Sequence, residues 1–417
     1  MSAVLFRAPL FNPTGPDGLQ WWSDGALLVQ DGHIAASGPF DAVAGHGEQR
    51  VVELDGVIVP GFADVHIHWV QHRVRGRLGL ELMPWLREHI WPEEARYADP
   101  AFCAAAAPAF FDDVVRAGTV MGMAYSSSHP HAARTAAACS IGDWLIGDSV
   151  MVQGAPAVLT GAGVDSIDTL DALARELGPR RYALTPRFAL NCSRELMAAM
   201  GAYARAGGYH VQTHLSESPA EVREVLEAFP EAEDYTDVYD RAGLLGQRTV
   251  LGHCVHLSER EWAVLAARRC WVAHCPSSNE ALDSGRMDLE AVRRHDIAYA
   301  LASDVGAGPS HSMLHVMQRY LQLHRAAGVP VSATEALYRA TLAGAQCMGR
   351  GAIAGNLAPG KRADFVLLPR PSGAVEPAGW IEEWVQGSMT ALESRPLGTW
   401  VAGLPVGREC LLSQSGA

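Results

Sequence analysis

Histidine and acidic residues stand at the ends of several apolar, strand-like runs of this sequence. His66 and His68 end one run, and their i, i+2 spacing places both imidazoles on the same face of a strand. His214 ends another run, His253 lies near the end of a third, and Asp304 lies at the end of the last. Imidazole nitrogens and a carboxylate are ligands that Zn²⁺ and Fe²⁺ accept. Each residue taken singly is more often structural, but their joint placement at strand ends favours one metal site.

A divalent cation at such a site would indicate hydrolysis. It lowers the pKa of its bound water from about 15.7 towards 7, and thereby supplies a nucleophile at neutral pH. Glu217 follows His214 by three residues, where a carboxyl group can transfer protons beside the metal. The sequence therefore predicts hydrolysis by a metal-activated water.

The pattern of the chain between residues 57 and 305 explains how these residues could meet. Eight apolar runs each precede an amphipathic helical stretch, such as 101–117, which ends at Gly118. Eight βα units over about 290 residues are typical of a (β/α)8 TIM barrel, an α/β fold whose catalytic groups lie at the C-terminal ends of the strands. The expected strands are 57–68, 119–126, 149–157, 182–190, 209–214, 249–256, 270–275 and 297–305.

Both ends of the chain are rich in short strand-like runs. Residues 26–30 and 33–37 alternate around an Asp31-Gly32 turn, which predicts a β-hairpin. Residues 363–368 and 398–406 near the other end are similar in character. We expect the two ends to form one smaller composite β-sandwich domain. The expected division is 1–57 and 353–417 for this domain and 58–352 for the barrel.

The composition is that of a globular protein of 417 residues, with 48% hydrophobic and 19% charged residues. A formal net charge of −13 disfavours nucleic acid and anionic membranes as partners, because both would repel the chain, and favours a small-molecule substrate. The first residues lack a signal-peptide pattern and no apolar run reaches the ~18–20 residues of a membrane span, so we expect a cytoplasmic location. Eight scattered cysteines without a C-x-x-C motif are expected to be reduced core residues.

The ordered set of 60–68, His214, His253 and Ser303-Asp304 resembles the amidohydrolase superfamily, as does segment 355–365. The resemblance covers nearly the whole chain. Binuclear members bridge two ions through a carboxylated lysine on a barrel strand, whereas the single lysine here, Lys361, lies beyond the expected barrel. The resemblance therefore implies one divalent ion, Zn²⁺ with Fe²⁺ as the alternative, and the deaminase branch. The implied metal ligands are His66, His68, His214 and Asp304.

Several separated segments are similar to the guanine deaminases in particular. Gln71, shortly after the H-x-H pair, matches a position that this group uses for purine contact. The resemblance implies hydrolysis of guanine to xanthine and ammonia, and a homodimer. The matching segments are 85–86, 91–94, 184–188, 214–217, 235–239, 274–279 and 304–314.

The same resemblance implies roles for residues around the metal. Asp304 would also accept the proton of the water, His253 would orient the reacting group, and Glu217 would protonate a ring nitrogen and then the leaving ammonia. The implied substrate contacts are Arg187 to the purine carbonyl, Gln71 to the ring edge, and Phe188 and Trp85 flanking the ring. By residue type alone, a salt bridge is the commoner setting for an arginine, and the hydrophobic core is the commoner setting for aromatic residues.

Three departures from the family pattern leave the ring substrate open: Trp69-Val70, Pro309 and His311. One alternative is the same mechanism on another aminated heterocycle, namely a pterin, an oxidised purine or an aminotriazine. A non-catalytic scaffold with this fold is a second alternative. The presence of every expected metal ligand disfavours the scaffold.

Overall fold

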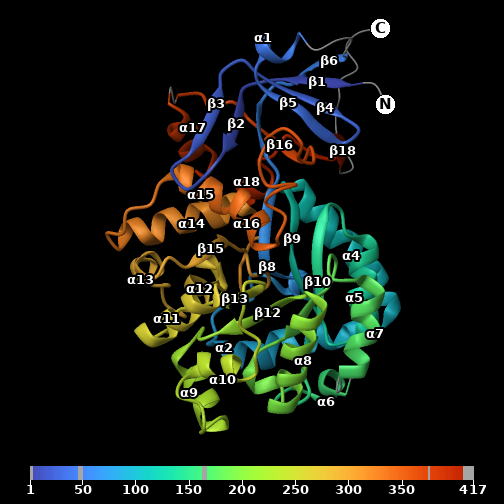
Figure 1. Ribbon diagram of the computed structural model, residues 1–417, viewed down its shortest axis with the longest axis vertical. Coiled ribbons are helices and arrows are strands. Elements are labelled where there is room, and N and C mark those ends of the chain that lie inside the picture. Colours follow the sequence, from blue (N-terminus) through green and yellow to red (C-terminus); the bar gives the residue numbers. More distant parts are fainter. Residues whose placement is uncertain (1–2, 46–49, 162–166, 374–375, 407–417) are drawn as a thin grey trace.

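The computed structural model describes residues 3–45, 50–161, 167–373 and 376–406, and its centre is an eight-stranded parallel barrel (Figure 1). Each strand pairs in parallel with the next in chain order. The barrel closes where the Asp304 N–H donates to the His66 carbonyl and the His68 N–H donates to the Val305 carbonyl, both over 2.8 Å. The strands are β8 Phe62–His68, β9 Thr119–Ser126, β10 Asp143–Val150, β11 Ala183–Pro186, β12 His210–Leu215, β13 Thr249–His253, β14 Trp271–His274 and β15 Ala298–Leu301.

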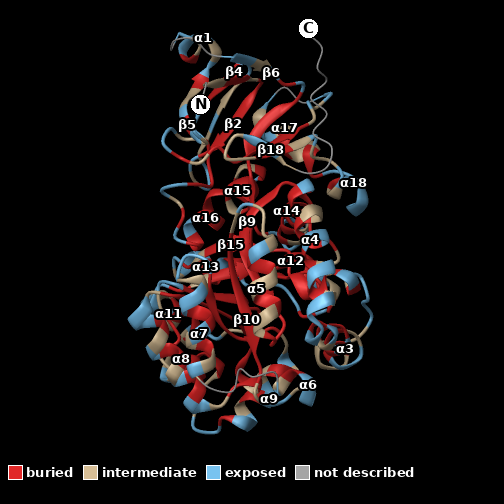
Figure 2. Ribbon diagram, turned by 90° about the vertical axis from the view of Figure 1, so that its right-hand side faces the viewer, coloured by how far each residue is buried: buried red, intermediate tan, exposed pale blue. Residues whose placement is uncertain are grey.

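Amphipathic helices surround these strands, with their exposed residues on the outside and the buried strands within (Figure 2). In α7, for example, Leu170, Leu173 and Ala174 are buried at helical spacing. The prediction of a (β/α)8 barrel is confirmed. The main helices of this part are α4 Pro100–Arg116, α5 Pro130–Cys139, α7 Ile167–Leu177, α8 Arg194–Gly207, α9 Pro219–Ala228, α10 Tyr235–Arg241, α11 Glu259–Arg268, α12 Pro276–Ala281, α13 Leu289–Arg294, α14 Met313–Ala326, α15 Ala333–Arg339 and α16 Leu342–Cys347.

Two mixed sheets built from both ends of the chain stand beyond one end of the barrel (Figure 1). They pack face to face, because Phe6 of one sheet lies 5.1 Å from Phe365 of the other, measured between ring centroids. This confirms the composite β-sandwich, and the pairing of β4 with β5 confirms the hairpin. The four-stranded sheet has the order β5 His33–Pro39, β4 Gly25–Gln30, β1 Val4–Arg7, β6 Arg50–Glu53. The six-stranded sheet has the order β18 Leu404–Val406, β17 Gly398–Val401, β16 Phe365–Leu368, β7 Val57–Pro60, β2 Leu10–Pro13, β3 Leu19–Trp22.

The expected strand 57–68 is in fact two strands that belong to different sheets. β7 pairs with β16 in the sandwich, and β8 begins the barrel. Gly61 lies between them, and a Cβ atom there would come within 2.3 Å of Val120 Cγ2. The chain therefore passes from one sheet to the other at a residue without a side chain.

The expected strand 149–157 is displaced, because β10 spans Asp143–Val150 and ends where the prediction begins. Two aspartates and Gly147 interrupt the apolar pattern of this strand. Asp148 is nevertheless buried, because the Tyr182 hydroxyl donates a hydrogen bond to its carboxylate. Apolar periodicity alone does not reveal a strand in which an acidic residue is buried through a hydrogen bond from a residue that is distant in the sequence.

Two expectations from composition can be compared with the described residues. None of their helices has the length and apolar character needed to cross a membrane. Seven of the eight cysteines are described, all seven are free, and six of these are buried, as predicted. Cys410 lies outside the described residues.

Candidate active site

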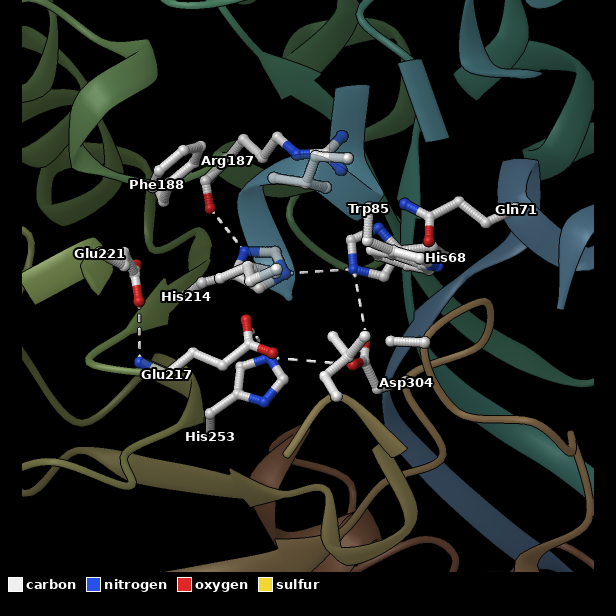
Figure 3. Close-up of a pocket in the computed structure, with 14 residues that line it drawn as sticks. His68, Gln71, Trp85, Arg187, Phe188, His214, Glu217, Glu221, His253 and Asp304 are labelled. Atoms are coloured by element: carbon white, nitrogen blue, oxygen red, sulfur yellow. Dashed lines mark hydrogen bonds and ion pairs between the residues drawn. The ribbon is translucent and has the colours of Figure 1, made fainter. Parts of the chain in front are cut away.

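A cavity of about 410 Å³ opens at the C-terminal ends of the barrel strands (Figure 3). Its apolar wall consists of Leu82, Trp85, Leu86, Phe188, Leu282 and Ala307. Its polar groups are His68, Gln71, Arg187, His214, Glu217, Glu221, His253 and Asp304. All four predicted substrate contacts and the three predicted proton-transferring or orienting residues therefore line one cavity.

The four predicted metal ligands meet at the base of this cavity. His66, His68, His214 and Asp304 each offer one ligand atom, and these atoms all lie within 4.8 Å of one another. Asp304 Oδ1 is 3.3 Å from His66 Nε2 and 3.4 Å from His68 Nε2. His68 Nε2 is also 3.2 Å from His214 Nε2 (Figure 3). Two strand ends, those of β8 and β12, and the loop after β15 thus bring four donors to one point.

The protonation of these side chains suits a cation. His214 Nδ1 lies 2.6 Å from the Arg187 carbonyl oxygen, which can only accept, so the proton is on Nδ1 and the lone pair on Nε2. Burial lowers the pKa of His66, His68 and His214, so the rings are neutral at pH 7. His66 Nε2 has no hydrogen-bond partner among the described residues. Such an unpaired buried atom beside a carboxylate fits a divalent metal ion.

Asp304 provides the negative charge of the set. It follows the end of β15 by three residues and has a φ of 51°, a left-handed conformation that side chains rarely adopt. Burial by itself would raise its pKa, but the close approach of His66 Nε2 at 3.3 Å and the charge of His253 outweigh burial and lower the pKa to about 2. The Ser278 hydroxyl donates to Oδ2. Asp304 is therefore ionised and held from two sides.

Glu217 and His253 form a second pair beside the metal set. His253 Nε2 lies 3.5 Å from Glu217 Oε2, and His253 Nδ1 lies 2.9 Å from Asn279 Oδ1. Burial raises the pKa of Glu217 to about 7, against the opposing charge of His253. Burial also tends to lower the pKa of His253, but the charges of Glu217 and Asp304 outweigh it and raise that pKa. Such a pair can exchange a proton near neutral pH.

Glu221 is a cavity residue that the sequence reasoning missed. Its Oε2 accepts the N–H of Glu217 over 2.8 Å, and its Oε1 accepts the Tyr235 hydroxyl over 3.0 Å. Tyr239, one turn further along α10, donates its hydroxyl to the His214 carbonyl over 2.9 Å. The sequence analysis matched the segment 235–239 to the guanine deaminases but gave it no role. In the structure this segment supports the backbone around His214 and Glu217.

Arg187, directly after β11, and Gln71, in the 3-10 helix Trp69–Val74 that follows β8, both line the cavity (Figure 3). Arg187 Nη1 donates to both oxygens of Glu94, over 2.8 and 2.7 Å, and Gln71 Nε2 donates to Glu94 Oε1 over 2.7 Å. Trp85 Nε1 donates to the Arg77 carbonyl, which leaves the indole ring on the cavity wall. Sequence reasoning also missed Glu94, although it lies within the matching segment 91–94.

The residues that depart from the family pattern do not line the cavity. Trp69 is fully buried in the core, where its ring lies 4.9 Å from that of Tyr97 between centroids. The His311 ring packs 5.4 Å from that of His72. Val70 and Pro309 are likewise absent from the cavity wall. These four residues therefore form no part of the cavity wall.

The amidohydrolase family model matches residues 57–403, which is most of the chain. The chain belongs to the amidohydrolase family. Within this family it is 37% identical over 395 residues to a probable guanine deaminase of Deinococcus radiodurans, with 89% of each chain covered. It is 34% identical over 364 residues to the guanine deaminase of Escherichia coli K12, covering 84% of this chain and 82% of that protein.

A comparison of folds also finds a guanine deaminase among the similar proteins. A solved structure of the E. coli guanine deaminase matches with a TM-score of 0.92 and 28% sequence identity. The match covers 97% of this chain and 100% of that chain. Amidohydrolases are metal-dependent, and this chain carries a His/Asp group that can hold a metal ion.

Proposed function

We propose that this chain catalyses the hydrolytic deamination of guanine to xanthine and ammonia. The observation that carries the proposal is the meeting of His66, His68, His214 and Asp304 at the base of a cavity that also contains Arg187. Similarity to guanine deaminases at 34–37% identity over most of the chain supports the same substrate. In this reaction a C–O bond to water forms at the amidine carbon, and the bond from that carbon to its amino nitrogen breaks.

We propose His66, His68, His214 and Asp304 as the ligands of one Zn²⁺ ion. Three neutral imidazoles and one carboxylate suit Zn²⁺, and Fe²⁺ can bind the same donors. When bound, the ion activates a water molecule for attack at neutral pH. The only lysine of the chain, Lys361, donates its Nζ to the Ala354 carbonyl after the last barrel helix, which supports a single ion.

The composition of the cavity wall suits a flat, neutral ring. Apolar side chains form much of this wall, and a few polar groups, among them Arg187 and Gln71, also line the cavity. We assign Arg187 to the purine carbonyl and Gln71 to the ring edge, with Phe188 and Trp85 against the ring faces. Both aromatic side chains are at most 5% exposed, so a ring between them would be shielded from water.

Glu217 and His253 are the proposed groups for proton transfer. Glu217 has a raised pKa of about 7 and can carry a proton at Oε2 near neutral pH, before it protonates a ring nitrogen of the substrate. Glu217 is negatively charged after it has lost that proton, and His253, whose Nε2 lies 3.5 Å away, stabilises this charge. Asp304 accepts one proton of the water, and this proton passes by way of Glu217 to the leaving amino group, which departs as ammonia. The second proton of the water is released as the new carbonyl forms, and it returns to Glu217 and restores its protonated state.

Three further expectations remain proposals. The family resemblance supports a homodimer, and the free cysteines are compatible with a reducing, cytoplasmic setting. The division of the chain at residues 57/58 and 352/353 is retained as a proposal for the domain boundaries. Size-exclusion chromatography with light scattering would test the dimer.

Ammonia release from a panel of heterocycles tests the proposed substrate. Metal-loaded protein is expected to convert guanine to xanthine, and to release less ammonia from a pterin, an oxidised purine or an aminotriazine. Turnover of one of these compounds with none of guanine would assign the same mechanism to a different substrate. Protein that binds no stoichiometric metal and releases no ammonia from any compound would be a scaffold.

A further inference from the structure

Glu94 is a carboxylate buried behind the cavity wall rather than a member of it. It lies in α3 Trp91–Ala95 and has no exposed surface. Both of its oxygens accept from Arg187 Nη1, and Oε1 also accepts from Gln71 Nε2. A buried carboxylate is stable only when it is paired and hydrogen-bonded, and here both partners are proposed substrate contacts.

The contact with Glu94 determines which Arg187 donors face the cavity. Only Nη1 is engaged by the carboxylate, and within the described residues Nε and Nη2 donate to no protein atom. Arg187 itself is 3% exposed and lines the cavity. Since a guanidinium is planar and rigid, fixing Nη1 also fixes the direction of the remaining donors. Those donors require an acceptor, such as a ring carbonyl, on the substrate.

The contact with Glu94 also determines the orientation of the Gln71 amide. Gln71 Nε2 donates to Glu94, while Gln71 Oε1 accepts the N–H of Gly306 over 3.2 Å. A carboxylate can only accept and a backbone N–H can only donate, so the reversed amide would lose both hydrogen bonds. Gly306 follows Asp304 by two residues, so this chain of contacts connects the substrate wall with the loop of a proposed metal ligand.

We propose that Glu94 is a positioning residue that sets the selectivity of the site for purines with a ring carbonyl. It acts through Arg187 and Gln71, whose donors it orders before the substrate enters. A ring without the carbonyl leaves those buried donors unpaired, which is a strong basis for rejection. This inference rests on the proposed function, because it takes Arg187 and Gln71 to be the substrate contacts.

Glu94→Gln and a matched control test the inference. Glu93→Gln is the control, because Glu93 is an adjacent buried acid whose partners, Arg96 at 2.9 Å and Arg73 at 3.5 Å, are about half exposed. The readouts are kcat and KM for guanine and for 2-aminopurine, which lacks the carbonyl, together with bound metal per chain.

In Glu94→Gln the KM for guanine is expected to rise about 10- to 100-fold, as expected for losing charged hydrogen bonds that order a buried site. The kcat/KM preference for guanine over 2-aminopurine is expected to fall by a similar factor, with bound metal unchanged. Glu93→Gln should change neither quantity more than about twofold. An unchanged KM and an unchanged preference in folded Glu94→Gln would overturn the inference.

Glu94→Asp is the second variant if Glu94→Gln does not fold. It keeps the charge but withdraws the carboxylate by about one bond length, ~1.5 Å. A smaller shift of KM and preference in the same direction would support the inference, and a fall of kcat alone would contradict it. Failure of the wild type to release ammonia from guanine would instead overturn the proposed function, so the two failures are distinguishable.

Discussion

Replacing Gly252 by alanine should disturb the proposed metal site without replacing a ligand. Gly252 immediately precedes His253 in β13, and a Cβ atom there would lie 2.7 Å from Cε1 and 3.0 Å from Nδ1 of His66. The His66 ring has little freedom to move away. It is 1% exposed, and its centroid lies 4.5 Å from that of Tyr125 and 4.7 Å from that of His214.

The expected loss of zinc affinity follows from how far the His66 ring or the strand must move to make room for the added Cβ atom. Ordinary van der Waals contact begins at 3.4 Å, so the His66 ring or the strand must shift by about 3.4 − 2.7 = 0.7 Å. Disturbing the support of a metal ligand lowers metal affinity by about 10- to 100-fold. Overpacking a core site also destabilises the fold by about 1–3 kcal/mol. We therefore expect Gly252→Ala to bind Zn²⁺ about 10- to 100-fold more weakly.

Competition with a chelator of known affinity measures this effect, with guanine turnover recorded at limiting zinc. Gly246→Ala is the control, because a Cβ atom at Gly246 would have no neighbour within 4 Å. The control should bind zinc like the wild type. Wild-type zinc affinity in Gly252→Ala would refute the reasoning, since the His66 ring would then not need its observed position to bind the ion.

The metal ion, Glu217 and Asp148 give three more predictions. Removal of the ion should lower the Tm, because a ligand at about 100 times its Kd stabilises the folded state by about 2.7 kcal/mol; an unchanged Tm would contradict metal binding at this site. Glu217→Gln should abolish guanine turnover and keep the bound metal, whereas near-normal turnover would exclude Glu217 from proton transfer. Burial raises the pKa of Asp148 from 3.8 to about 6, so folding favours its protonated form, and this stabilisation is lost as the pH rises through 6. In urea unfolding, the free energy of unfolding of Asp148→Asn relative to that of the wild type should therefore rise by about 2 kcal/mol between pH 4 and 7, and a pH-independent difference would refute this account.

The parts of the fold that follow local patterns could be predicted from the sequence. The Asp31-Gly32 turn predicts its hairpin because that turn chemistry is local, and His66 and His68 share a face because a strand alternates. The barrel then brings His214 and Asp304 to the same rim, since parallel strands end together. The assignment of these four residues as metal ligands agrees with their placement and remains a prediction.

Contacts between loops above the barrel could not be predicted. Glu94 joins Gln71, which is 23 residues away, and Arg187, which is 93 residues away, and no local pattern connects them. His253 and Asn279 are likewise 26 residues apart. The strand at β10 was displaced for a related reason, since the partner that allows Asp148 to be buried is Tyr182, 34 residues further along.

Titration of Zn²⁺ into chelator-treated protein, with xanthine formation from guanine as the readout, tests most directly whether the four gathered side chains hold the one ion that the reaction needs. Activity is expected to rise linearly and to reach its plateau at one ion per chain. A plateau at two ions, or full activity before any metal is added, would contradict the account.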